Sequence, residues 1–138
     1  MTPHELRQRT AKFAEEVGAF AGPLLERIRT RDHAEQLIRA SSSAAANYRS
    51  AGRARTHTEF TSRLAVTLEE ADESQYWLQH LNACRLADRD RIAPLLQEAT
   101  ELVAIFTSSW KTADEEEKRR KNTRPPRHRR RRRKDGAD

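Results

Sequence analysis

The sequence has few of the residues that form turns, disulfides or aromatic cores. Its 138 residues include 4 Gly, 5 Pro, 1 Cys and only 6% aromatic residues. Scarce glycine and proline, together with 35% charged residues, are typical of amphipathic helices rather than turn-rich sheets. The one cysteine, Cys84, cannot form an intrachain disulfide, so we expect a reducing, cytoplasmic location.

Long hydrophobic runs are also absent. The longest run without a glycine, proline or polar residue extends over five residues, from Leu102 to Phe106, whereas a membrane span needs about 20. Charged residues recur every few positions through the first thirty residues. We therefore expect neither a secretory signal peptide nor a transmembrane helix, and no membrane partner.

Positive charge is concentrated at the C-terminus. Residues 111–138 hold 13 of the 27 Lys and Arg but 6 of the 21 Asp and Glu, a formal charge of +7. The other 14 basic and 15 acidic residues give residues 1–110 a charge of −1. The basic character belongs to the tail, and the body gives little electrostatic reason to bind nucleic acid.

Apolar residues recur at helical spacing in four segments. The patterns predict helices over residues 4–21, from Asp32 as the cap to about Gly52, after Thr56 or Thr58, and after Asp88 or Asp90. The small residues 40–46 predict a close helix contact. The chain is thus predicted to be all-α, an antiparallel up-and-down four-helix bundle over 1–113, with a charged helix extension and a disordered basic tail over 114–138.

The tail predicts contact with a polyanion. Residues 118–134 hold 12 Lys and Arg and no acid, and arginine forks pair well with phosphate oxygens. A charge run that only solubilises the chain and an anionic membrane surface are the alternatives, and we favour RNA or DNA. The predicted nucleic-acid-binding residues are Lys118, Arg119, Arg120, Lys121, Arg124, Arg127, Arg129, Arg130, Arg131, Arg132, Arg133 and Lys134.

A second polar group lies within the predicted helices. Arg39, Ser43 and Asn47 repeat every four residues, and Glu70 and Glu73 offer carboxylates on the third helix. These residues could form an active site or an ion site. We favour a buried hydrogen-bond network, with Asn47 bonded to Glu70 or Glu73, that fixes the register of the helices.

Other candidate groups are weaker. Tyr76, Trp77 and Trp110 could stack on bases, although packing in the core or at a subunit interface is the preferred interpretation. A basic patch of Arg49, Arg53 and Arg55 could extend an RNA path. No histidine follows a glutamate by three residues, no second thiol joins Cys84, and no phosphate-binding loop is present. We therefore expect no metal, no cofactor and no catalytic residue, so the protein is predicted not to be an enzyme.

The segment from Gln36 to Leu81 carries a distinctive pattern. Its residues are Arg39, Ser41, Ser43, Ala46, Asn47, Phe60, Leu64, Glu70, Ala71, Glu73, Tyr76, Trp77 and Leu78. This pattern resembles the bacterial four helix bundle protein family, first noticed within intervening sequences of 23S ribosomal RNA genes. The chain departs from many members at Ser50, where they carry an acid three residues after the asparagine. The arginine-rich tail is not a general family feature either.

The resemblance implies a ring-like homopentamer. The family is also similar to the accessory variability determinants of diversity-generating retroelements, which are basic pentameric bundles that work with a reverse transcriptase and its RNA. A nucleic-acid-binding accessory protein with a reverse transcriptase as partner is the function so implied. A structural bundle that binds only other proteins is the alternative.

Overall fold

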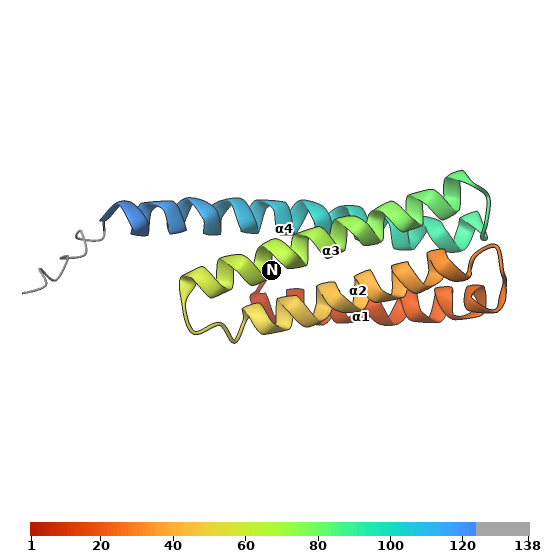
Figure 1. Ribbon diagram of the computed structural model, residues 1–138, viewed down its shortest axis with the longest axis horizontal. Helices are drawn as coiled ribbons and strands as arrows, with labels where there is room; N and C mark the ends of the chain where they lie inside the picture. Colours follow the sequence, from red (N-terminus) through yellow and green to blue (C-terminus); the bar gives the residue numbers. More distant parts are fainter. Residues whose placement is uncertain (124–138) are drawn as a thin grey trace, which may run out of the picture.

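The fold is a bundle of four α-helices. The computed structural model describes residues 1–123. Its elements are α1 (Pro3–Ala21), the short 3-10 helix η1 (Gly22–Glu26), α2 (Arg31–Ala51), α3 (His57–Ala83) and α4 (Arg89–Thr123). Both α1 and α3 contact α2 and α4, and the colours of Figure 1 show the chain reversing direction at each connection. The prediction of an all-α, four-helix chain is confirmed.

Local sequence sets both ends of α1. The Thr2 hydroxyl accepts a hydrogen bond from the Glu5 backbone N–H (3.1 Å), and the Glu5 carboxylate accepts one from the Thr2 N–H (2.8 Å). This reciprocal capping satisfies two N–H groups that a helix start leaves without partners. At the other end, Gly22 and Pro23 begin η1, so α1 ends at Ala21 as the sequence predicts.

The start of α2 differs from the prediction that Asp32 caps it. Thr30 occupies the cap position, and its hydroxyl donates to the Leu24 carbonyl (2.7 Å) instead of capping the helix. Asp32 lies inside the first turn, where its negative charge still favours the positive end of the helix dipole. The helix begins earlier because the buried Thr30 is tied to η1, a contact that local spacing does not reveal.

One face of the small-residue stretch in α2 lies in the interior. Ala40 and Ser41 are fully buried and Ala44 is 1% exposed, whereas Ser42 and Ala46 are exposed. Small side chains on the buried face leave room for a neighbouring helix. Farther along α2, the Tyr48 ring lies 5.1 Å from the Phe106 ring of α4.

The third helix is capped as its T-x-x-E pattern indicates. The Thr56 hydroxyl accepts a hydrogen bond from the Glu59 backbone N–H (3.1 Å).

Apolar residues of all four helices meet in one core. The largest apolar side chains that are completely buried are Phe13, Val17, Leu37, Leu64, Leu78, Leu81, Ile92, Leu102 and Phe106.

The last helix extends beyond the other three, as Figure 1 shows. Its contact with the start of α3 nevertheless continues past residue 113, because His57 Nε2 lies 3.0 Å from the Ala113 carbonyl and Thr58 donates to the buried Glu117 (2.6 Å). The exposed extension therefore begins near Lys118 rather than at residue 114. Among residues 1–123, no helix combines the length and apolar character needed to cross a bilayer.

Candidate nucleic-acid interface

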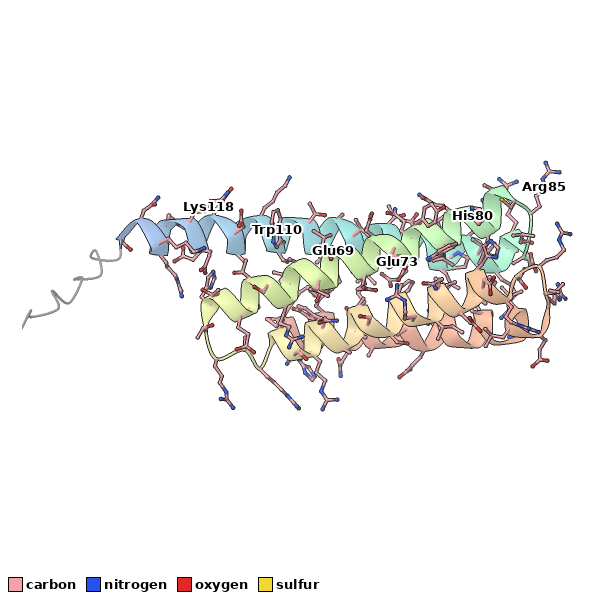
Figure 2. All side chains as sticks on the ribbon, in the orientation of Figure 1. Glu69, Glu73, His80, Arg85, Trp110 and Lys118 are labelled. Carbon is pink, nitrogen blue, oxygen red and sulfur yellow. The ribbon has the colours of Figure 1, made fainter. Side chains whose placement is uncertain are left out.

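Four of the twelve predicted nucleic-acid-binding residues lie on the exposed end of α4. Lys118 to Lys121 form the last turns of this helix, and Figure 2 shows Lys118 on the part that extends beyond the bundle. The other eight lie outside the described residues, namely Arg124, Arg127, Arg129, Arg130, Arg131, Arg132, Arg133 and Lys134.

The four cations at the end of α4 are paired with carboxylates of the same helix. Lys118 binds Asp114 (3.1 Å), Arg119 and Arg120 both bind Glu116 (2.6 and 3.2 Å), and the Lys121 ammonium lies 4.0 Å from Glu117. The hydrogen bond from Arg120, with the charges of both arginines, lowers the pKa of Glu116. These exposed pairs are weak, so phosphates can compete for the cations.

The excess positive charge of the tail is not spread evenly along it. Residues 111–123 carry five Lys and Arg and four Asp and Glu, a net charge of +1. Residues 124–138 carry eight Lys and Arg and two Asp, a net charge of +6. The uncompensated charge of the tail therefore lies after Thr123.

The predicted polar network is partly present, and Arg39 is its centre. One guanidinium nitrogen of Arg39 lies 3.2 Å from the Glu70 carboxylate, and another binds Glu73 on the same face of α3. The hydrogen bond from Arg39 lowers the pKa of Glu73, with a smaller contribution from the Trp77 indole N–H. Half of the Arg39 side chain is exposed, so this is a surface clamp between α2 and α3 rather than a buried site.

The predicted bond from Asn47 to Glu70 or Glu73 is wrong. The Asn47 amide donates to the Ser43 carbonyl (2.9 Å) and lies 3.1 Å from the Ser43 hydroxyl, one turn earlier in α2. Its side-chain oxygen accepts from Arg63 of α3 (3.3 Å). Helix geometry favours the four-residue pairing of Asn47 with Ser43. The bond from Arg63 to Asn47 is a second α2–α3 contact, separate from that of Arg39.

The aromatic residues singled out in the sequence lie in two places. Trp110 is half-buried against the core, and so is Trp77. Tyr76 is 53% exposed, and its ring meets that of Trp77 edge-on at 5.0 Å. His80 and His33 stack beside them at 5.0 Å, but within residues 1–123 no group of three or more His, Cys, Asp or Glu could hold a metal ion.

A basic groove between α1 and α2 was not predicted. The groove has a volume of about 570 Å³, and its basic lining consists of His4 and Arg7 from α1 with Arg49 and Arg53 from the end of α2. In the part of the chain that the structure describes, none of these arginines forms an ion pair. Arg55 of the predicted patch does not line the groove.

Packing at Gly52 explains how Arg7 joins this groove. Gly52 ends α2 with an ordinary helical φ of −65°, so its backbone does not require glycine. A Cβ atom there would come within 3.0 Å of the Arg7 guanidinium. The missing side chain therefore lets Arg7 lie over the end of α2, beside Arg49 and Arg53. The four-residue spacing of these last two was the only sequence signal for the groove.

These features define a small, all-α protein of the four-helix-bundle class with charged clamps between α2 and α3 and an unpaired basic groove between α1 and α2. A family model described as 23S rRNA-intervening sequence protein matches residues 4–108. The chain belongs to this family, which confirms the relationship indicated by the residues from Gln36 to Leu81.

A solved structure has the same fold. It is the crystal structure of a protein of unknown function from the S23 ribosomal protein family of Bacteroides thetaiotaomicron, with a TM-score of 0.71 and 24% sequence identity. The match covers 77% of this chain and 98% of that chain. No curated protein matches the sequence.

Proposed function

We propose that this protein is a non-enzymatic accessory protein that binds nucleic acid, RNA in particular, through its C-terminal basic segment. The proposal rests on the distribution of basic residues that lack acidic neighbours. Lys118 to Lys121 have carboxylate partners on their own helix, whereas residues 124–138 hold eight Lys and Arg against two Asp. Such a segment releases counterions when it neutralises phosphates.

The bundle fixes the end of α4 that precedes this segment. Glu117 is buried, and its carboxylate accepts a hydrogen bond from Thr58 of α3. Glu117 lies about two helical turns before the basic segment begins. The end of α4 is thereby anchored to the first turn of α3. The family description, which names a 23S rRNA intervening sequence, supports RNA over DNA as the ligand.

Assembly into a homopentamer is part of the proposal, since the resemblance to ring-forming family members implies it. Five basic segments on one particle would raise the apparent affinity through effective concentration, without any additional contact. Sedimentation velocity of the full chain tests this step. A single species of five chains is the expected result, and a monomer at micromolar concentration would contradict it.

The test of nucleic-acid binding compares the full chain with a chain that ends at Thr123. This truncation leaves every contact of residues 1–123 in place, including the ion pairs of Lys118 to Lys121. Fluorescence anisotropy with a labelled single-stranded RNA should show a large loss of affinity in the truncated chain. Unchanged affinity and unchanged salt dependence would refute the proposal.

A second candidate function is protein binding, and the exposed Tyr76 favours it. This ring is 53% exposed beside Trp77, and exposed tyrosine is common in protein interfaces. A reverse transcriptase is the partner that the family resemblance suggests. Association with that purified enzyme that survives nuclease treatment and is lost on Tyr76→Ala substitution would favour this function.

A further inference from the structure

The groove between α1 and α2 concentrates positive charge on a body that is neutral as a whole. Arg7, Arg49 and Arg53 approach it from two helices. Two arginines of the bundle have acidic partners, since Arg9 pairs with Glu98 and Arg39 with Glu73. Among residues 1–123, Arg27, Arg29 and Arg85 at the opposite end form no ion pair. Across residues 1–123, no carboxylate pairs with the three groove arginines.

Helix stability does not account for this cluster. Arg49 lies in the last turn of α2, where a cation interacts favourably with the helix dipole. Arg7 and His4 lie near the start of α1, the positive end of that helix, where a cation gains nothing from the dipole. Grouping these side chains without an acid costs repulsion, which a bound anion would relieve.

The shape of the groove suits one nucleotide unit at a time. Its volume of about 570 Å³ falls within the range of about 300–1,000 Å³ that is usual for small-ligand sites. Small residues, among them Ala45 and Gly52, form part of its wall and leave apolar surface beside the arginines. A sugar and base can lie on such a surface while guanidinium forks bind the phosphates.

The groove also lies at the end of the bundle from which the basic segment continues. Figure 1 shows that α1 begins, α2 ends and α4 ends toward the same side of the molecule. A nucleic-acid strand that passes the end of α4 can therefore extend to the groove. We infer that the groove binds the phosphate backbone of a single nucleic-acid strand whose neighbouring nucleotides contact the basic segment. This inference rests on the proposed nucleic-acid function.

The test replaces the three groove arginines in the full chain, as R7A/R49A/R53A. A matched control, R27A/R29A/R85A, removes the same charge at the opposite end of the bundle, where these arginines line another hollow and where Figure 2 labels Arg85. Affinity for a single-stranded oligouridylate is measured at several salt concentrations. Circular dichroism shows whether each variant keeps its helices.

The expected result follows from counterion release. Each phosphate contact on a single strand contributes about 0.7 to the slope of log affinity against log salt. Loss of three contacts should lower the slope by about 2 in the groove variant and leave it unchanged in the control. If Arg7 proves necessary for folding, the double variant R49A/R53A should lower the slope by about 1.4.

Three results would overturn the inference. The control could lower the slope as much as the groove variant, which would mean that binding depends only on total charge. The groove variant could lose affinity for polyglutamate to the same extent, which would assign the groove to acidic polymers in general. The full chain could bind uridine monophosphate while the groove variant still binds the oligonucleotide normally. The groove would then be a site for free nucleotides and not for a nucleic-acid strand.

The two proposals fail in different ways. A groove variant that behaves like the unmodified chain, together with loss of affinity on truncation at Thr123, refutes the groove and leaves the proposed function standing. A truncated chain that keeps full affinity refutes the proposed function whatever the groove variant does.

Discussion

Replacing Arg39 with alanine removes the charge that joins two carboxylates of α3 to α2. The Arg39 guanidinium lies 3.2 Å from Glu70 and binds Glu73, and its side chain is 49% exposed. Water screens such contacts, and exposed ion pairs contribute about 0.2–1 kcal/mol each. With two pairs lost, we expect the free energy of unfolding at pH 7 to fall by about 1 kcal/mol.

The effect of Arg39 should depend on pH in a defined direction. Its hydrogen bond lowers the pKa of Glu73 in the folded protein below the ordinary glutamate value of about 4.3. The unfolded chain therefore takes up the proton first as the solution is acidified. The contribution of the pair is complete above the unfolded pKa and is lost as the pH falls through the lowered, folded pKa.

Urea denaturation followed by circular dichroism measures this effect at pH 7 and pH 3. A double-mutant cycle with Glu73→Gln isolates the coupling between the two side chains. Lys12→Ala is the control, because Lys12 pairs only with Glu16 on its own helix (3.7 Å). A loss from Arg39→Ala that is equally large at pH 3, or a coupling energy of zero, would refute the reasoning.

Three further substitutions test the packing and capping of the bundle. Ala44→Leu should overpack the α2 interior and destabilise the fold by about 1–3 kcal/mol, whereas Ala46→Leu on an exposed position should change it by less than about 0.5 kcal/mol in urea denaturation. Thr56→Ala should cost about 1 kcal/mol, measured by thermal unfolding, because the Glu59 N–H loses its cap. Phe106→Ala should cost about 3–5 kcal/mol in urea denaturation, since this ring is completely buried, and a loss under 1 kcal/mol would contradict its place in the core.

The sequence predicts the helices well because their signals are local. The Thr2 and Thr56 hydroxyls cap backbone N–H groups three residues later, and Gly22 with Pro23 stops α1. The Asp32 cap fails for a non-local reason, since the hydroxyl of Thr30 bonds back to Leu24 and brings the helix start forward. A capping residue is predictable only where no tertiary contact competes for it.

The candidate site is less predictable because it depends on pairing between helices. Arg7 is far from Arg49 and Arg53 in sequence, and only the packing of α1 on α2 brings them to one groove. Net charge conceals this cluster, since acids elsewhere in the body balance the total. The prediction for Asn47 also failed on pairing. A partner on α3 was expected for its amide, but the amide donates to Ser43 of its own helix.

The most direct test of the account is the salt dependence of single-stranded RNA binding by the full chain and by the chain ending at Thr123. Residues 124–138 contain eight Lys and Arg. At about 0.7 per phosphate, their full engagement predicts that truncation lowers the slope of log affinity against log salt by about 6. Equal slopes for the two chains would contradict the central claim that this segment supplies the affinity for nucleic acid.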